Sequence, residues 1–97
     1  MKKFFYRVTN LDSVQSLSKR FSIPVGKIIS LNALKTDVEE GDLLYLEQVD
    51  AQTYVVKPTD TLTSIAQKFC LPASEILKEN DTDYLYYSQV ILIKKGR

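Results

Sequence analysis

The sequence predicts an α+β fold built from two tandem modules, each with the element order strand, helix, helix, strand. The first observation is a repeat: the chain of 97 residues resembles itself at an offset of 48 positions, from Tyr6 to Tyr54. The second is that each copy passes from a strand-like apolar pattern to a helical one and back. A fixed internal period indicates a duplicated structural unit. In each module we expect a two-stranded antiparallel sheet with two helices packed on one face.

The repeat rests on eight identical residue pairs. They are Tyr6 with Tyr54, Val8 with Val56, Asp12 with Asp60, Ser16 with Ser64, Phe21 with Phe69, Pro24 with Pro72, Ile28 with Ile76, and Asn32 with Asn80. Similar residues fill most of the positions between them. After Asn80 the offset drops to 47, so that GDLLYL at 41–46 aligns with SQVILI at 88–93. The second copy therefore has one loop residue fewer.

Each copy is expected to open with a strand followed by a capped helix. YRV at 6–8 and TYVVK at 53–57 are short, aromatic and β-branched, as strands prefer. Asp12 and Asp60 then stand where a carboxylate can accept hydrogen bonds from the first amides of a helix, and we predict both as N-caps. In the first copy Gln15 is placed to complete a variant capping box with Asp12.

The first helix of each copy is predicted from apolar residues at i, i+3, i+4 and i+7. These are Leu62, Ile65, Ala66 and Phe69 in the second copy, and Val14, Leu17, Ser18 and Phe21, with one polar exception, in the first. Cys70 follows this face in the second copy. We interpret it as a small, partly buried apolar residue rather than a reactive thiol, because the chain has no histidine to activate it.

A second helix follows in each copy. Pro24 and Pro72 cannot continue the first helix, but a missing amide has no cost in a first turn, so they are placed to begin the next. That helix is predicted to end at Asn32 and Asn80, a residue type that tolerates the left-handed conformation. LLYL at 43–46 and VILI at 90–93 then form buried closing strands. The predicted modules are 1–47 and 54–97, with a linker at 48–53.

Composition and charge exclude several classes of function. Thirteen basic and twelve acidic residues give a net charge of +1, so neither a nucleic acid nor a membrane surface is an expected partner. The apolar fraction of 44% and charged fraction of 26% are typical of a soluble globular protein, without the run of about 18 apolar residues that crosses a membrane. With no histidine and one cysteine, the sequence predicts no catalytic residue, no metal site, no cofactor and no intrachain disulfide.

The second copy, YVVKPTDTLTSIAQKFCLPASEILKENDTDYLYYSQVILI, resembles a LysM domain, and the first copy resembles a more divergent one. The likeness is carried by the tyrosine and valine strand, by Lys-Pro-x-Asp-Thr-Leu at 57–62, by Ser-Ile-Ala at 64–66, and by Phe69 and Asn80. The two copies cover nearly the whole chain. The resemblance implies a non-catalytic module that binds polymers containing N-acetylglucosamine, chiefly peptidoglycan and chitin.

The resemblance also implies a shallow glycan groove between the loop after the first strand and the loop after the second helix. In the second copy this groove consists of Thr59, Asp60, Thr61 and Leu62 on one side and of Asp81, Thr82, Asp83 and Tyr84 on the other. In the first copy it consists of Leu11, Asp12, Ser13 and Val14 facing Ala33, Leu34 and Lys35. Loop amides and carbonyls would bond the N-acetyl group while an apolar side chain packs on its methyl or ring face.

Several of these residues have a simpler interpretation. Helix capping alone explains Asp12 and Asp60. Tyr84, Tyr86 and Tyr87 either stack on sugar rings or cover a small core with their hydroxyls in water. NDTD at 80–83 is a polar loop with too few oxygen ligands in sight for calcium. The basic residues at the two ends of the chain are taken as solvated; they are Lys2, Lys3, Lys94, Lys95 and Arg97.

A second function stays open, an assembly protein whose modules contact protein partners or one another, for example in a spore layer, with glycan binding lost. The opening MKKFFYRVTN favours it, because Arg7 and Asn10 interrupt the apolar core that an export signal needs. Leu11 and Thr59 also favour it, since they stand where the family usually has glycine. The expected location is the cytoplasm or a spore layer of a bacterium, or the cell wall if another route exports the chain.

Overall fold

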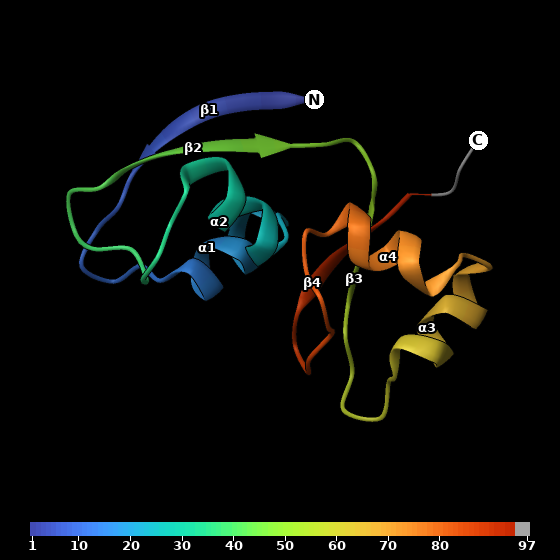
Figure 1. The fold of residues 1–97 in the computed structure, drawn as a ribbon. Coiled ribbons are helices and arrows are strands. Elements are labelled where there is room, and N and C mark those ends of the chain that lie inside the picture. The colour runs from blue at the N-terminus through green and yellow to red at the C-terminus, as the bar shows by residue number, and fades with distance from the viewer. Residues whose placement is uncertain (95–97) are drawn as a thin grey trace.

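The computed structural model describes residues 1–94 and contains two consecutive βααβ modules (Figure 1). The first consists of β1 (Lys2–Arg7), α1 (Val14–Phe21), α2 (Val25–Asn32) and β2 (Leu43–Gln48). The second consists of β3 (Gln52–Val55), α3 (Leu62–Phe69), α4 (Ala73–Glu79) and β4 (Val90–Ile93). The predicted fold class is confirmed. Lys95 and Arg97, predicted as solvated basic residues, lie outside the described part.

Each module has its own antiparallel sheet. In the first, β1 pairs with β2 from Lys2 opposite Gln48 to Arg7 opposite Leu43. In the second, β3 pairs with β4 from Gln52 opposite Ile93 to Val55 opposite Val90. The strands extend into the segment 48–53, so that residues 49–51 connect the two sheets. The boundaries 1–47 and 54–97 stay predictions.

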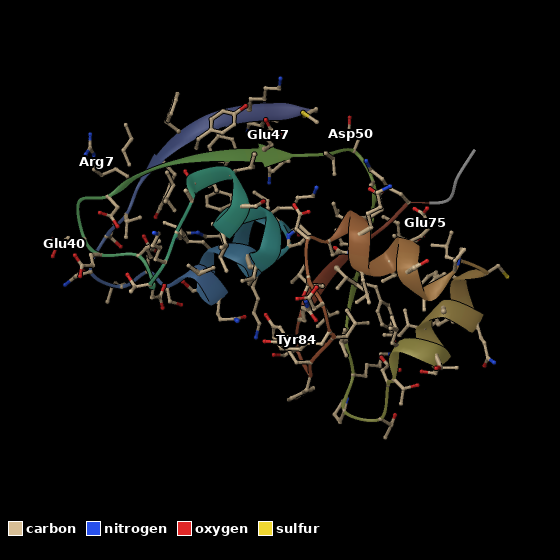
Figure 2. The ribbon with its side chains drawn as sticks, in the orientation of Figure 1. Arg7, Glu40, Glu47, Asp50, Glu75 and Tyr84 are labelled. Atoms are coloured by element: carbon tan, nitrogen blue, oxygen red, sulfur yellow. The ribbon has the colours of Figure 1, made fainter. Side chains whose placement is uncertain are left out.

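The hydrophobic cores of the two modules are separate. The first core gathers Val8, Val14, Leu17, Ile23, Ile28, Val38, Leu44 and Leu46. The second gathers Val56, Ile65, Phe69, Ile76, Ile91 and Ile93. In each module both helices pack on one face of the sheet (Figure 1). The connection that carries Asp50 lies at one end of the boundary between the modules, and Tyr84 lies at the other end (Figure 2). Burial alternates along β2, so the buried Leu44 and Leu46 mark the face of the first sheet that the helices cover, whereas all four residues of β4 are buried.

The residues that cap the first helix of each module differ from the prediction by one position. Ser13 caps α1 and Thr61 caps α3, each accepting from the amide three residues on at 3.0 Å. Ser16 and Ser64 complete reciprocal capping boxes. The prediction that Asp12 and Asp60 are N-caps, with Gln15 in the box, is wrong. The hydroxyls of Ser13 and Thr61, one residue later, cap the helices, so the carboxylates of the two aspartates are free to accept other hydrogen bonds.

Asn32 and Asn80 join the second helix to the closing strand. The Asn80 side-chain amide donates to Ile76 O at 2.8 Å and to Leu92 O at 3.1 Å, and its oxygen accepts from Leu92 N at 2.6 Å. Asn32 makes the same three bonds to Ile28 and Tyr45. The partners are 13 residues apart in the first module and 12 in the second, which confirms the lost loop residue.

The prediction that these asparagines take the left-handed conformation is wrong, because the residues after them do so. Ala33 has φ 50° and Asp81 has φ 50°, whereas Asn80 has φ −107°. Cys70 ends α3 with φ 58° and is exposed, so its predicted partial burial is also wrong. Cys70 follows Phe69, the last buried residue of α3, and takes the left-handed conformation with which helices commonly end.

Candidate functional site

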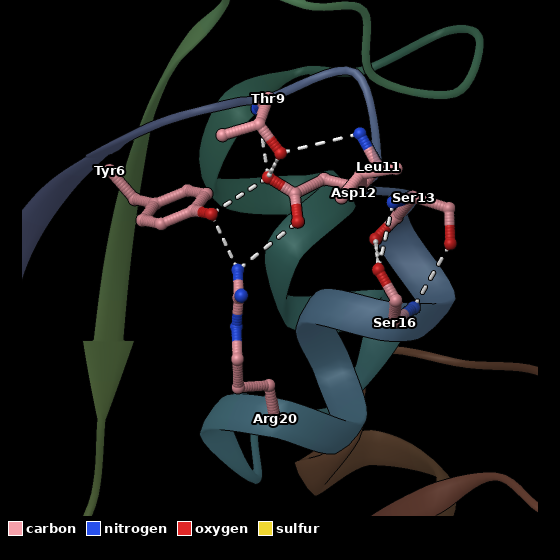
Figure 3. A network of polar contacts seen from close by, with 7 residues as sticks. All are labelled: Tyr6, Thr9, Leu11, Asp12, Ser13, Ser16 and Arg20. Carbon is pink, nitrogen blue, oxygen red and sulfur yellow. Dashed lines mark hydrogen bonds and ion pairs between the residues drawn. The ribbon is translucent and has the colours of Figure 1, made fainter.

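The loop after β1 is held by a buried carboxylate (Figure 3). Asp12 Oδ2 accepts from Tyr6 Oη at 2.7 Å, from Thr9 N at 2.8 Å and from Thr9 Oγ1 at 3.0 Å. Arg20 Nη2 lies 3.2 Å from Asp12 Oδ1, and its guanidinium stacks over the Tyr6 ring at 5.1 Å. The Asp12 side chain is only 5% exposed. Asp12 is thus turned inward to shape the loop.

The second module repeats this arrangement. Asp60 Oδ2 accepts from Tyr54 Oη at 2.6 Å and from Lys57 N at 2.8 Å. Lys68 takes the place of the arginine, with its ammonium 4.7 Å from the centre of the Tyr54 ring. Each module thus has one carboxylate that joins its first strand to the following loop, Asp12 with Tyr6 and Asp60 with Tyr54. We call each of these pairs, with its bonds to the loop, a loop brace. The brace explains why both a tyrosine and an aspartate recur in the repeat.

The loop braces shift the pKa values of their carboxyl groups. The pKa of Asp60 is lowered, chiefly by the Tyr54 hydroxyl and then by the Lys57 amide, both of which favour the charged form. The pKa of Asp12 is lowered chiefly by the Thr9 amide and then by the Tyr6 hydroxyl. The same bond raises the pKa of Tyr54, because only the neutral hydroxyl can donate it to Asp60.

We expect the fold to lose stability in acid and Asp60→Asn to weaken that dependence in the second module. An aspartate in the unfolded chain titrates at about pH 4, and the pKa of Asp60 in the folded chain is lower. The brace therefore contributes fully above about pH 4, and its contribution is lost as the pH falls through the folded pKa. Urea unfolding between about pH 3 and 7 measures it. The control is Asp83→Asn at an exposed loop carboxylate. An equal acid dependence in both variants would contradict the role of the brace.

A shallow groove of about 260 Å³ opens on the first module. It is lined by Val14, Gln15, Val25, Ile29, Leu34, Lys35, Thr36 and Asp37. The groove brings together Val14, Leu34 and Lys35 from the two predicted sides. Leu11, Asp12, Ser13 and Ala33 are not among its lining residues. Leu11 is 87% exposed beside the loop brace.

The sequence does not reveal Asp37 as a groove residue. Its Oδ1 accepts from Val14 N at 2.9 Å and from Val38 N at 2.7 Å, so this carboxylate ties the two groove loops together. At the offset of 47 its counterpart is Tyr84, which has no carboxylate. The repeat therefore carries no signal for this contact.

Two groove residues on α2 are also absent from the predicted site. The sequence identifies Val25 and Ile29 only as apolar residues of the second helix, but Ile29 is 40% exposed and lines the groove, whereas Ile28 is fully buried. Adjacent helical residues point about 100° apart. The pair Ile28 and Ile29 was therefore a usable signal, since both could not face the core.

A larger groove of about 560 Å³ lies between the two modules. The first module contributes Gln15, Val25, Gly26 and Ile29, and the second contributes Asp81, Thr82, Tyr84, Tyr86 and Gln89. The predicted residues Asp81, Thr82 and Tyr84 are thus brought together, but against the first module. Its lining does not include Thr59, Asp60, Thr61, Leu62 or Asp83. Figure 2 shows Tyr84 on the side of its module toward the first.

Asp81 links the two modules. Its Oδ2 accepts from Ser30 Oγ at 3.0 Å and lies 3.3 Å from Lys27 Nζ, both on α2. Gln15 Nε2 donates to Tyr86 Oη at 2.9 Å across the same boundary. The Asp81 carboxylate is thereby engaged by the first module, as an ion pair and hydrogen bond together.

The comparison with protein families agrees with this architecture. A family model described as LysM domain matches residues 6–46 and again residues 54–94. The chain belongs to the LysM domain family. Each match lies within one βααβ module, and the LysM domain is a non-catalytic module. No helix within residues 1–94 is both long and apolar enough to span a bilayer.

Similar proteins are larger than the LysM chain. It is 28% identical, over an alignment of 106 residues, to the "Probable peptidoglycan endopeptidase LytE" of Bacillus subtilis (strain 168). The alignment covers 92% of the chain and 32% of LytE. The spore cortex-lytic enzyme SleL of Bacillus megaterium QM B1551 matches with 28% identity and a TM-score of 0.48, over 95% of the chain and 22% of SleL. The spore cortex-lytic enzyme SleL of Bacillus cereus matches with 24% identity and a TM-score of 0.47, over 100% of the chain and 24% of that SleL. The chain thus spans about a third of LytE.

Proposed function

We propose that this LysM chain is a non-catalytic carbohydrate-binding protein that recognises polymers containing N-acetylglucosamine, of the peptidoglycan or chitin-like kind. The observation that carries the proposal is the first-module groove, where apolar Val14 and Leu34 lie beside polar Gln15 and Thr36. Apolar side chains suit the acetyl methyl and the ring face, and polar groups suit the amide and hydroxyls. The similarity to LytE, a probable peptidoglycan endopeptidase, supports peptidoglycan as the polymer.

The charges of the grooves favour an uncharged sugar. The first-module groove carries one cation, Lys35, and one anion, Asp37, whose Oδ1 accepts from two backbone amides. In the inter-module groove Asp81 is paired with Lys27. Neither groove therefore offers a free cluster of one sign for a polyanion. The family-derived residues at 59–62 remain part of the proposal, with Asp60 acting through loop shape. Those at 81–84 are proposed to add contacts only to a longer chain, because Asp81, Thr82 and Tyr84 line the inter-module groove and not the first-module groove.

Sedimentation of the intact chain with purified peptidoglycan and with chitin tests the proposal. We expect the chain to pellet with at least one polymer, and Ile29→Ser to lower the affinity about tenfold by removing an apolar contact from both grooves. Leu31→Ser is the matched control, because Leu31 is 38% exposed against 40% for Ile29 and lies on the same helix outside both grooves. No pelleting with either polymer would refute the function.

An assembly role is the second candidate, and one observation favours it. The sheet face opposite the helices of the first module exposes Phe5 by 67% and Leu43 by 54%, and the Phe5 and Tyr45 rings lie 5.5 Å apart. Such exposed apolar area suits a protein partner or self-association. Sedimentation equilibrium gives the oligomeric state, and the pelleting assay gives polymer binding. A stable dimer without polymer binding supports assembly, and a monomer that pellets with cell wall supports glycan binding. A bacterial cytoplasm, spore layer or cell wall stays the predicted location.

A further inference from the structure

The two grooves of the LysM chain are parts of one surface. The first-module groove of about 260 Å³ and the inter-module groove of about 560 Å³ share three lining residues, Gln15, Val25 and Ile29. These residues come from the start of α1 and from one side of α2. The two grooves therefore adjoin along these three residues.

The larger groove has the side chains that hold sugar rings. Tyr84 is 65% exposed, and its ring lies 6.1 Å from that of Tyr86 with an interplanar angle of 49°. Two tilted aromatic faces offer apolar surface to the ring hydrogens of a pyranose. The Tyr86 hydroxyl accepts from Gln15 and can still donate its own proton to a ligand. Gln15 donates one hydrogen bond to Tyr86, and within residues 1–94 its side-chain amide keeps an acceptor and a second donor for an acetamido group.

The inter-module groove is held in shape by a close backbone contact. Gly26 of α2 lies so near the loop after α4 that an added Cβ would stand 2.3 Å from Asn80 O and 2.4 Å from Asp81 O. The bonds from Lys27 and Ser30 to Asp81 fix the same contact. A groove formed in advance spares a ligand the cost of ordering its walls.

We propose that the inter-module groove is a second saccharide subsite, continuous with the first-module groove, so that one glycan segment crosses the module boundary. The proposal rests on the proposed function and deepens it. It assigns ring stacking to Tyr84 and Tyr86, and it makes Gln15 a contact shared by both subsites. The ligand is an uncharged chain of N-acetylated amino sugars long enough to span both grooves.

Titration calorimetry with the disaccharide and the hexasaccharide of N-acetylglucosamine tests this subsite on the intact chain. We expect the hexasaccharide to bind more tightly, Tyr84→Ala to weaken hexasaccharide binding about tenfold, and its disaccharide binding to stay within about twofold. Tyr87→Ala is the matched control, because Tyr87 is also 65% exposed but does not line the groove. We expect it to change neither affinity.

The outcomes separate the subsite from the proposed function. If both sugars bind but Tyr84→Ala leaves the hexasaccharide affinity unchanged, or lowers both affinities equally, the continuous subsite is overturned while glycan binding stands. If neither sugar nor either polymer binds, the function falls and the subsite with it. Amide shifts in NMR give an independent readout: the hexasaccharide should shift Thr82 and Tyr86, and shifts confined to residues 59–62 would overturn the subsite.

Discussion

Asn80→Ala is expected to lower the free energy of unfolding of the second module by about 3 kcal/mol, the largest single-residue effect that we expect on stability. Asn80 is fully buried and makes three hydrogen bonds, two of them to the backbone of Leu92 in β4. Alanine would leave the amide and the carbonyl of a buried strand residue without partners. Both groups are then desolvated with no bond in return.

Urea unfolding and hydrogen exchange measure this effect. The amide of Leu92 should lose protection, while amides of β2 in the first module should keep theirs, because the two cores are separate. Asn32→Ala is the matched comparison: it removes the same three bonds, but Asn32 and Tyr45 are only partly buried. Water can replace some of those bonds, so its effect should be smaller. Equal effects in the two modules would contradict the role of burial.

The fold could be predicted because every identical pair of the repeat has a structural role. Tyr6 and Asp12 form the loop brace with their counterparts in the second module, and Ser16 completes a capping box. Val8 and Ile28 are buried, and each has an equally buried counterpart. The three remaining pairs also have structural roles: the second helix begins after Pro24 and Pro72, the brace tyrosine packs on Phe21 and Phe69, and the helix is joined to the closing strand by Asn32 and Asn80. The residues that are identical in the two copies are therefore those that stabilise each module, and this is why the repeat predicts the fold.

The same reasoning explains why the site could be predicted only in part. The groove residues stand at positions where the copies differ, such as Asp37 against Tyr84, so the repeat does not mark them. The cap error has a local cause: Asp12 and Ser13 both suit an N-cap, and the choice is decided by Tyr6, which reaches the carboxylate from β1. Contacts between modules have no counterpart in a repeat of single modules.

Gly26 is the clearest of these unrepeated features. Its counterpart at the offset of 48 is Ser74, an exposed residue of α4. Only the copy whose second helix faces the other module has glycine, where no side chain fits. Glycine lowers the stability of a helix by about 1 kcal/mol relative to alanine. Its presence within α2 is therefore explained by the approach of the second module rather than by the helix itself.

We accordingly expect Gly26→Ala to separate the modules without unfolding either. A Cβ at 2.3 Å from Asn80 O and 2.4 Å from Asp81 O meets backbone atoms, which cannot swing aside as a flexible side chain would. The ion pair of Asp81 with Lys27 should break as the modules move apart. The helix itself gains stability from alanine, so a loss of docking cannot be mistaken for a loss of folding.

Small-angle scattering measures the separation, since the docked chain has a Cα radius of gyration of 13.6 Å and a larger value is expected for Gly26→Ala. Ser74→Ala, which makes the same kind of change at the matched position of α4, should leave the scattering unchanged. In the separated chain the wall of Gln15 and Ile29 no longer faces Tyr84, so hexasaccharide affinity should fall toward that of the disaccharide. Unchanged scattering with unchanged affinity would show that the modules do not need this contact, and that the crossing of the boundary by one glycan does not depend on Gly26.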